Sequence, residues 1–472
     1  MLPTFTRRQF LQACAATAAL AALPSAARSE APAAKRPNFL FILTDDQRWD
    51  ALGCVNPLVH TPTLDALAAR GVRFADAFVA TSICSPSRAC CLTGRYGSAN
   101  GVTAVDKKGQ HWRKGEKTFA QMLKAAGYQT GFVGKWHIDR LTPQQAGFDS
   151  AVYFVSNGPW VDREVMTEAG PAVAKGFIED YNAARAVAFL ESAAKKDAPF
   201  VLHLCSQVPH MTQDMDWKPS AASLVLVDEA KMAVPGNYAD DLTDKPPHLK
   251  TGRHRTQAAT YGYASAEGIQ RHRRQYLASV TDMDRSLGAV MAALDRLGLR
   301  ETTWVIHMGD NGWFLGEHGF TSKVLPYEDS IRVPMIIAGP GTAGRVDNHF
   351  VMNADLAPTI LDLAGLPVPA NMHGRSLAPL LRSESPPWRE AVYYEAPTAD
   401  LGSWPLEAVR TKQWKYIRTF DLKDPSRTSF EELYDLAADG LEMKNLAADA
   451  GHKATLDGLR ADAARLKKGL VP

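Results

Sequence analysis

The chain has 472 residues, of which 46% are hydrophobic, and its formal net charge at pH 7 is +2. A chain of this length and composition can bury a large core, and we expect one large α/β domain with a smaller one. The near-neutral charge, without a polybasic segment or a nucleic-acid motif, excludes a typical nucleic-acid-binding protein.

The first 29 residues have the pattern of a bacterial export signal. Arg7 and Arg8 precede a modest Ala/Leu stretch that ends in small residues near 25–27, and the pair resembles a twin-arginine motif. Pro24 interrupts the apolar run, which is too short for a stable membrane span. We therefore expect export of residues 30 onward by the twin-arginine machinery to the periplasm or the medium, without stable membrane insertion.

Apolar runs that end in polar residues predict the strands of a buried sheet. These runs lie within 37–47, 129–133, 199–210, 302–312 and 333–341. Helices are predicted between them, within 61–71, 118–127 and 276–299, with Thr61 or Thr63 as an N-cap and Gly71 and Gly127 as C-caps. The alternation predicts a mostly parallel sheet covered on both faces. The polar tract 213–273 is predicted to be an irregular insertion near the substrate entrance.

Three of the six cysteines, Cys84, Cys90 and Cys91, fall within the stretch TSICSPSRACCLTGR. The six do not form a dense disulfide framework, and no CxxC pair indicates structural zinc. Because the side chains of adjacent Cys90 and Cys91 point in different directions, the two could not share a simple tetrahedral metal site with Cys84. We expect Cys90 and Cys91 to be packing residues and Cys54 and Cys205 to be buried thiols, which leaves Cys84 as the chemically special cysteine.

Polar side chains gather where the predicted strands end. These positions hold two acidic pairs and a basic set: Asp45, Asp46, Lys135, His137, His210, Asp310 and Asn311. Ligands of open α/β sheets bind at the carboxyl ends of strands, and carboxylate and amide oxygens suit Ca²⁺ or Mg²⁺. Each acidic pair alone could instead cap a helix or a turn. The two pairs together with the basic set favour a site.

Six blocks carry a resemblance to a known family. Along the chain they are LTDDQ, CSPSRACCLTGR, GYQTGFVGKWH, PFVLHLCSQVPH, GDNG and GEHGFTSKVLPYEDSIRVP. They resemble type I, formylglycine-dependent sulfatases of the alkaline-phosphatase-like superfamily, most closely the carbohydrate-directed branch. The resemblance implies a large mostly parallel sheet sandwiched by helices and a smaller C-terminal α+β subdomain. The expected bounds are 1–29 for the export signal, 36–380 for the catalytic domain and 381–472 for the subdomain.

The resemblance also implies roles for individual residues. Cys84 would be oxidised to Cα-formylglycine by a formylglycine-generating enzyme. The implied catalytic residues are Cys84, Arg88, Lys135, His137, His210 and Lys323. The implied ligands of one divalent cation, Ca²⁺ or alternatively Mg²⁺, are Asp45, Asp46, Asp310, Asn311 and the modified residue 84. Lys135, His210 and Lys323 would contact the substrate. His318 would either touch the substrate or stabilise its loop, and Trp160, Trp313 and His373 are further pocket candidates.

The implied activity is hydrolysis of sulfate monoesters, on a sulfated glycan. An aldehyde hydrate offers one hydroxyl to attack sulfur and a second to expel sulfate, which a thiol does not. Either His210 or Lys323 would protonate the leaving oxygen. Two alternatives remain: a phosphodiester or phosphonate monoester hydrolase of the same superfamily, and a secreted carbohydrate-binding protein with a decayed catalytic centre.

Overall fold

The computed structural model describes residues 36–105 and 109–470. The fold described below is that of the second of two units into which the chain divides, Pro37–Pro472. The predicted export signal lies outside the described residues. Among the helices of the described part, none is long and apolar enough to cross a membrane.

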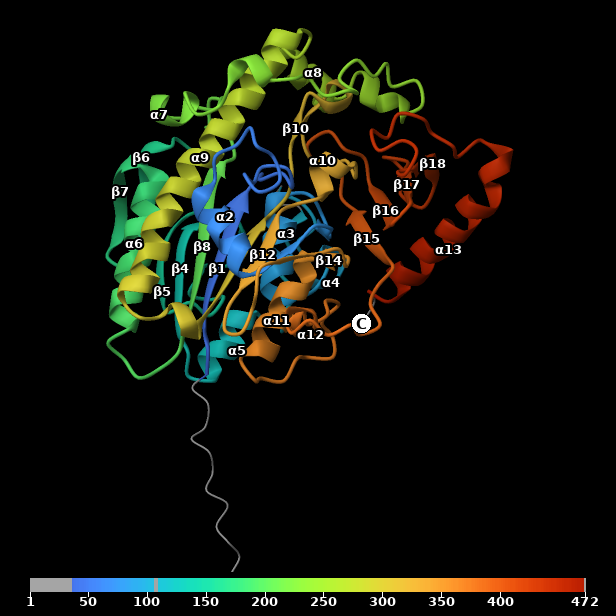
Figure 1. Ribbon diagram of the computed structural model, residues 1–472. Coiled ribbons are helices and arrows are strands. Elements are labelled where there is room, and N and C mark those ends of the chain that lie inside the picture. Colours follow the sequence, from blue (N-terminus) through green and yellow to red (C-terminus); the bar gives the residue numbers. More distant parts are fainter. Residues whose placement is uncertain (1–35, 106–108, 471–472) are drawn as a thin grey trace, which may run out of the picture. The chain divides into compact units, whose positions relative to one another are not determined.

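A ten-stranded mixed sheet forms the centre of the second unit (Figure 1). Its five central strands, in the order β9-β1-β8-β4-β5, are all parallel, whereas most of the flanking pairs are antiparallel. In spatial order the strands are β13 (Arg345–Asp347), β2 (Val72–Phe74), β12 (Met335–Ala338), β9 (Thr303–Gly309), β1 (Asn38–Asp45), β8 (Phe200–Pro209), β4 (Gln129–Lys135), β5 (Ser150–Phe154), β6 (Val161–Thr167) and β7 (Gly170–Phe177). The predicted α/β fold with a mostly parallel sheet is confirmed.

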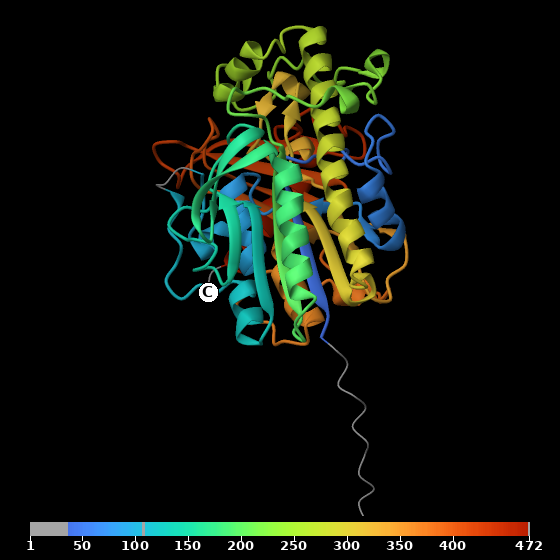
Figure 2. The ribbon, with the colours of Figure 1, turned by 90° about the vertical axis from the view of Figure 1, so that its left-hand side faces the viewer.

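Helices cover both faces of this sheet, as Figures 1 and 2 show. Along β1, Leu40 and Ile42 point into the core beneath α2 (Pro62–Arg70), α6 (Ile178–Ala193) and α9 (Ala266–Arg296). Phe39 and Phe41 point into the opposite core, beneath α3 (Cys84–Thr93), α5 (Phe119–Ala125) and α11 (Leu356–Leu363). Because both faces of β1 are buried, its sequence is apolar without alternation, as in other parallel sheets.

Helix α2 shows how the tertiary structure replaces a local cap. Thr61 is the N-cap residue, as predicted, but its side chain makes no capping hydrogen bond. The carboxylate of Asp284, on α9, instead accepts the backbone N–H groups of Thr63 and Leu64 at 2.9 and 2.8 Å. Gly71 follows the helix in an extended conformation with φ −132°. The entry of α2 is therefore fixed by a long-range contact that the local sequence does not reveal.

Two predictions about the chain are wrong. Helix α9 begins at Ala266, not near 276, because the Ser265 side chain accepts the N–H of Gly268 as an N-cap inside the tract predicted to be irregular. That tract also contains α7 (Ala221–Leu224) and α8 (Arg253–Thr260). Cys54 is exposed rather than buried, since it lies in a turn after β1, whereas Cys205, Cys90 and Cys91 are buried as expected.

A second, four-stranded antiparallel sheet forms the C-terminal part of the described chain, as predicted. Its strands are β15 (Ala391–Ala396), β16 (Leu406–Thr411), β17 (Trp414–Phe420) and β18 (Thr428–Asp435). Helix α13 (Lys453–Lys468) buries Leu456, Leu459 and Ala463 in the core of this sheet. The bounds 36–380 and 381–472 remain predictions.

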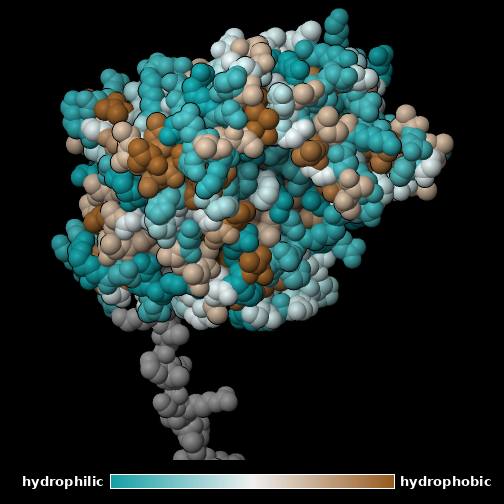
Figure 3. All heavy atoms as spheres, turned by 45° about the horizontal axis from the view of Figure 1, so that its top comes forward, coloured by the Kyte–Doolittle hydropathy of each residue, from teal (hydrophilic) through white to brown (hydrophobic). Residues whose placement is uncertain are grey.

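Short elements complete the described structure. They are β3 (Ala77–Phe78), β10 (Phe314–Leu315), β11 (Thr321–Ser322), β14 (Val351–Met352), α4 (Gly97–Asn100), α10 (Glu328–Ile331), α12 (Ala378–Leu381), η2 (Glu229–Lys231), η3 (Pro247–Lys250), η4 (Arg300–Thr302), η5 (Glu317–Gly319), η6 (Asn353–Asp355) and η7 (Ala450–His452). Helices α7 and α8 lie at the top of Figure 1, beyond the carboxyl ends of the central strands. The face that Figure 3 turns forward is mostly hydrophilic, with separate small hydrophobic patches.

Candidate active site

The two acidic pairs meet because β1 and β9 are parallel neighbours. Asp45 ends β1 and Asp46 follows it, and Asp310 follows β9 with its N–H bonded to the carbonyl of Thr44 at 2.8 Å. The N–H of Asp46 donates to Asp310 Oδ1 at 3.0 Å. Asp46 has φ 61°, a left-handed conformation that is uncommon outside glycine and that Asp and Asn tolerate best. All of these carboxylates are buried.

Cys84 is the first residue of α3, and its thiol faces the acidic cluster. Its Sγ–H donates to Asp45 Oδ1 at 3.2 Å, and the Lys323 ammonium lies 2.8 Å from Sγ. The Lys135 ammonium is 3.8 Å away on another side. Ligand atoms of Asp45, Asp46 and Cys84 lie within 4.8 Å of one another.

Arg88 lies one helical turn after Cys84, so both side chains project from the same face of α3. Its Nε–H donates to Asp310 Oδ2 at 3.0 Å and its NH1 donates to the carbonyl of Lys135 at 2.7 Å, while NH2 lies at ion-pair distance from Asp310 Oδ2, 2.8 Å. NH2 is also 3.8 Å from Asp45. A buried guanidinium therefore ties the start of α3 to the ends of β1, β4 and β9.

Two lysines surround the carboxylates. Lys135, the last residue of β4, pairs with Asp45, and Lys323, which follows β11, pairs with Asp46. Lys323 also lies 3.4 Å from Asn311 Oδ1. Each lysine thus contacts both a carboxylate and Cys84, and their side chains are almost fully buried.

His210, which follows β8, is the third group around Asp46. Its Nδ1 contacts the carbonyl of Met211 at 2.8 Å and its Nε2 lies 3.5 Å from Asp46 Oδ2. Burial lowers the pKa of His210 to about 3, so the ring is neutral. A carbonyl oxygen can only accept a hydrogen bond, so the ring nitrogen that faces it, Nδ1, must carry the single ring proton. Nε2 is therefore an acceptor.

His137 follows Lys135 in a left-handed conformation, φ 53°. Its carbonyl accepts a hydrogen bond from the hydroxyl of Ser85, the residue after Cys84, at 2.6 Å. Burial, and secondarily the Lys135 charge, hold the pKa of His137 well below its usual value. Its buried Nδ1 has no hydrogen-bond partner among the described residues.

The carboxylates differ in how well their charges are compensated. Burial alone would raise all three pKa values, but the charges of Lys135, Arg88 and Lys323 hold the pKa of Asp45 well below 3.8. Burial raises the pKa of Asp46 to about 6 and that of Asp310 to about 7, with the negative charge of Asp45 adding to both. The site therefore has capacity for further positive charge near Asp46 and Asp310.

The donor set fits a hard divalent cation. Buried Asp46 Oδ2 has no hydrogen-bond partner within the described part of the chain. Ligand atoms of Asp45 and Cys84 lie within 4.8 Å of those of Asp46. Asp310 accepts the N–H of Asp46, and Asn311 donates to the Asp46 carboxylate. Carboxylate and amide oxygens are the ligand types that Ca²⁺ and Mg²⁺ prefer. Three carboxylates balance the charges of Arg88, Lys135 and Lys323, so a bound cation would leave the centre positive and suited to an anionic substrate.

Burial raises the pKa of the Cys84 thiol to about 12, with the charge of Asp45 adding to the effect. At neutral pH the unmodified residue is therefore a thiol, whereas the reactive form of cysteine is the thiolate. An unmodified Cys84 would be a poor nucleophile in this setting.

His318 lies apart from this group. It sits in η5 with φ 53°, and its ring contacts Asp240 Oδ2 at 2.7 Å and Asn237 Nδ2 at 3.1 Å. Its carbonyl accepts from Arg255. Among the described residues it shares no hydrogen bond or ion pair with the other predicted site residues. The geometry favours the loop-stabilising alternative.

The further pocket candidates separate into two groups. Trp313 stacks edge-on to His210 with ring centroids 5.8 Å apart, and the Trp160 Nε1–H donates to the carbonyl of His210 at 3.1 Å. His373 instead accepts the N–H of Tyr96, after the far end of α3. Only the two tryptophans contact the residues around Asp46.

The sequence reasoning missed Asn157. Its Oδ1 accepts from the Lys135 ammonium, and its Nδ2 donates to His210 Nε2 at 2.8 Å. The neighbouring Ser156 is exposed, and its hydroxyl donates to the carbonyl of Asn157 at 3.3 Å. The signal for Asn157 was its place in a polar segment after β5, a strand-end position like those of the other candidates.

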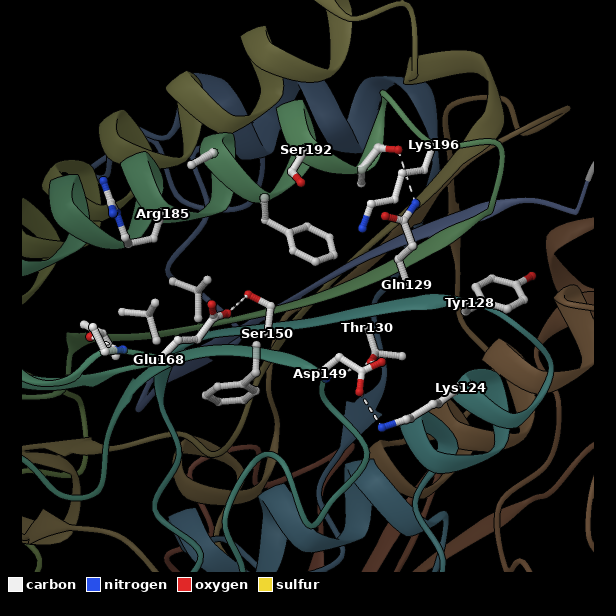
Figure 4. A pocket seen from close by; sticks show the side chains of 18 of the residues that line it. Lys124, Tyr128, Gln129, Thr130, Asp149, Ser150, Glu168, Arg185, Ser192 and Lys196 are labelled. Atoms are coloured by element: carbon white, nitrogen blue, oxygen red, sulfur yellow. Dashed lines mark hydrogen bonds and ion pairs between the residues drawn. The ribbon is translucent and has the colours of Figure 1, made fainter.

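The pocket in Figure 4 lies elsewhere in the fold. It has a volume of about 760 Å³ and opens between α6 and the amino-terminal ends of β4 and β5. Phe189 and Val152 contribute apolar surface, and Lys124, Arg185 and Lys196 contribute cations. None of the predicted site residues lines it.

Comparisons with known proteins agree with the geometry. The Sulfatase family model matches residues 37–366, and the model described as N-sulphoglucosamine sulphohydrolase, C-terminal, matches 316–469. The N-acetylglucosamine-6-O-sulfatase of Bacteroides thetaiotaomicron is 29% identical, over 91% of this chain and 86% of that protein. An ulvan-active sulfatase of Formosa agariphila is 30% identical, over 87% of this chain and 77% of its own length.

A solved structure is also similar. A protein in complex with its substrate, D-glucosamine-2-N,6-O-disulfate, superimposes with a TM-score of 0.83 at 28% identity. The match covers 92% of this chain and 98% of that one. The similarity therefore extends over the catalytic sheet and the C-terminal sheet together.

Proposed function

Because the chain belongs to the sulfatase family, whose model covers residues 37–366, we propose that it hydrolyses sulfate monoesters of a sulfated glycan with a nucleophile made from Cys84. Family membership makes it a sulfuric ester hydrolase. The observation that carries the proposal is the position of Cys84 Sγ, 2.8 Å from the Lys323 ammonium, 3.8 Å from that of Lys135 and 3.2 Å from Asp45.

The cationic groups of the chain bind and polarise the sulfate. A sulfate monoester is anionic and repels nucleophiles, so buried positive charge near sulfur stabilises the transition state. The ammonium groups of Lys135 and Lys323 lie near residue 84 on two sides. Arg88 forms ion pairs with the carboxylates of Asp310 and Asp45. Water has little access, since all three cations are nearly fully buried.

Residue 84 acts as Cα-formylglycine, which a formylglycine-generating enzyme produces from the cysteine. When hydrated, the aldehyde supplies one hydroxyl to attack sulfur and a second to release sulfate, dividing the reaction into two steps. The raised pKa of the unmodified thiol supports this modification. His137, neutral and with a buried unpartnered Nδ1, is the base that takes a proton from residue 84.

A divalent cation would be held by Asp45, Asp46, Asp310, Asn311 and residue 84. It would supply Lewis-acid polarisation of the sulfate and lower the pKa of the attacking hydroxyl. The oxygen-rich ligand set supports Ca²⁺, with Mg²⁺ as the alternative.

Lys323 is the proton donor to the leaving oxygen. It carries its proton beside Cys84 and Asp46, and its pKa is held well above its usual value because the carboxylates of Asp46, Asp45 and Asp310 outweigh the effect of burial. His210 presents an unprotonated Nε2 to Asp46, since its proton is on the Nδ1 that faces Met211. His210 and Asn157 therefore orient Lys135 and the sulfate.

The glycan is a 6-O-sulfated amino sugar. This choice rests on the named activity of the Bacteroides thetaiotaomicron relative and on the ligand of the similar solved structure. The twin-arginine-like start supports export to the periplasm or the medium, where such polysaccharides are encountered. Export after folding would let residue 84 be modified first.

The test is sulfate release by enzyme co-expressed with a formylglycine-generating enzyme. Substrates are N-acetylglucosamine 6-sulfate, D-glucosamine-2-N,6-O-disulfate, a phosphodiester and a phosphonate monoester, with ion chromatography as readout. The proposal predicts turnover of the 6-sulfates at least tenfold above the phosphorus esters. Higher turnover of the phosphorus esters would support the alternative hydrolase, and glycan binding without turnover would indicate a decayed centre.

A further inference from the structure

A second pocket lies at the far end of α3 from Cys84. Its volume is about 690 Å³, and it is bounded by the segment after α3, the loop 370–375, β15 and the end of α13. Its lining includes four arginines, one aspartate and one histidine: Arg95, Arg375, Arg389, Arg465, Asp355 and His373. Helix α3 has ten residues and is therefore about 15 Å long, which separates this pocket from the catalytic centre.

The single acidic group in the lining is already neutralised. Both carboxylate oxygens of Asp355 accept from Arg389, at 2.6 Å each, in a bidentate pair. The same oxygens accept the backbone N–H groups of Met352 and Arg375 at 2.8 Å. An anion entering the pocket would therefore not meet an uncompensated carboxylate there.

Arg95 provides a buried donor without a partner. Its residue is 7% exposed, and one of its terminal nitrogens pairs with Glu116 at 2.9 Å. Its Nε–H is buried and has no hydrogen-bond partner among the described residues. A buried N–H without an acceptor is costly, and an anionic oxygen would satisfy it.

Two arginines at the mouth add positive charge. The Arg375 guanidinium lies 5.9 Å from the Trp388 ring, and within the described chain it has no carboxylate at ion-pair distance. Arg465, on the last turns of α13, pairs with Asp462 at 2.6 Å and with no other carboxylate in the described part of the chain. Guanidinium groups bind tetrahedral oxyanions through parallel N–H donors, and both side chains remain available for this.

His373 contributes a neutral donor. Its Nδ1 accepts the N–H of Tyr96 at 3.1 Å. Burial and the Arg95 charge lower the pKa of His373 to about 4, so the ring is neutral and carries its proton on Nε2. The pocket thus combines several charged donors with a neutral one around a single concave surface.

The pocket of Figure 4 offers a contrast. Its Asp149 pairs with Lys124, its Glu168 accepts from Ser150 at 2.6 Å, and these two acids stand against three cations. Its three cations and two acids leave a charge of 3 − 2 = +1, whereas the four arginines and one aspartate of the arginine-lined pocket leave 4 − 1 = +3. The larger excess of positive charge distinguishes the arginine-lined pocket from the pocket of Figure 4.

We propose that the arginine-lined pocket binds a sulfate group, at a site separate from the catalytic centre. The shared chemistry is a tetrahedral oxyanion held by Arg95, Arg375, Arg465 and the Nε2–H of His373. The group can come from free inorganic sulfate or from a sulfated polysaccharide that the enzyme holds at a second point. This binding does not depend on the proposed hydrolysis.

Equilibrium dialysis with ³⁵S-labelled inorganic sulfate tests the proposal. A Lys135→Ala, Lys323→Ala variant removes binding at the catalytic centre, and its full chain is expected to retain one equivalent of sulfate. Adding Arg375→Gln and Arg465→Gln should weaken that binding by at least about tenfold. Both side chains are exposed or solvent-facing, so the fold should persist, which circular dichroism checks.

Arg185→Gln, in the pocket of Figure 4, is the matched control, because it removes an arginine charge from a different pocket. It should leave sulfate binding unchanged. Equal loss in the control and the test variant would mean non-specific charge effects, and it would overturn the proposal. If sulfate binds only above about 10 mM, the bound ion is an adventitious ion only, and this result would also overturn the proposal.

Competition distinguishes the two sources. Displacement of labelled sulfate by a heparin hexasaccharide, but not by its desulfated form, identifies a polysaccharide sulfate; displacement only by inorganic sulfate identifies the free ion. Crystals soaked in selenate supply an independent readout, since anomalous scattering should locate an ion within hydrogen-bond distance of Arg95 Nε. A loaded catalytic centre with an empty arginine-lined pocket would contradict the proposal.

Discussion

Replacing Asn157 by alanine should reduce catalysis without unfolding the enzyme. The side chain accepts from the Lys135 ammonium and donates to His210 Nε2 at 2.8 Å, so it fixes two groups of the sulfate pocket. A hydrogen bond to a charged group is worth about 1.5–3 kcal/mol. Loss of that much transition-state positioning corresponds to a fall in kcat/KM of about 10- to 100-fold.

The assay is the initial rate of sulfate release from N-acetylglucosamine 6-sulfate, with kcat and KM fitted separately and thermal unfolding recorded in parallel. Ser156→Ala is the matched control, because its hydroxyl bonds only to the carbonyl of Asn157 and is exposed; it should stay within about twofold of wild type. If Asn157→Ala also stays within about twofold while its modification at residue 84 is complete, the positioning role is refuted.

Four further results are expected. Cys84→Ser should lose nearly all turnover while folding normally, since one hydroxyl can accept sulfate but no second one can expel it; multiple turnovers by this variant would contradict the two-hydroxyl scheme. Chelation with EGTA should abolish activity and Ca²⁺ should restore it; full activity with no bound metal would exclude the cation. Cys91→Ala should cost about 1 kcal/mol of unfolding free energy, by loss of a fully buried side chain; an unchanged denaturation midpoint would argue against a packing role. Burial raises the pKa of Glu179 from 4.5 to about 7, so between these pH values the folded state keeps a proton that the unfolded state has lost. The contribution of this group to the free energy of unfolding should therefore fall by up to about 3 kcal/mol as the pH rises from 4.5 to 7. Glu179→Gln should flatten this pH dependence in urea titrations, and an unchanged slope would show that another group titrates.

The strand ends of the site could be predicted from the sequence because the local pattern determines them. Apolar runs must stop where the sheet ends, and Asp45 and Asp310 follow such runs on strands that turned out to be parallel neighbours. The block that begins at Cys84 also predicted correctly that the two following cysteines are buried in α3. What was predictable is the set of groups whose place depends on a strand or helix boundary.

Other features depend on contacts between distant segments. Asn157 reaches Lys135 and His210 from an irregular segment between β5 and β6, where no periodic pattern constrains it. His318 stands in a block that resembles the family's active site, yet it bonds to Asp240 from the polar tract. That tract was predicted to be irregular because its polarity hides the N-cap at Ser265.

Specific activity as a function of the modified fraction of residue 84 tests the central claim most directly. Preparations co-expressed with graded amounts of a formylglycine-generating enzyme are digested, and the peptide containing Cys84 is quantified by its mass loss of about 18 Da on conversion of the thiol to the aldehyde. Sulfate release from N-acetylglucosamine 6-sulfate should rise in proportion to the modified fraction and extrapolate to zero for unmodified enzyme. Full turnover by preparations in which Cys84 is unmodified would contradict the account.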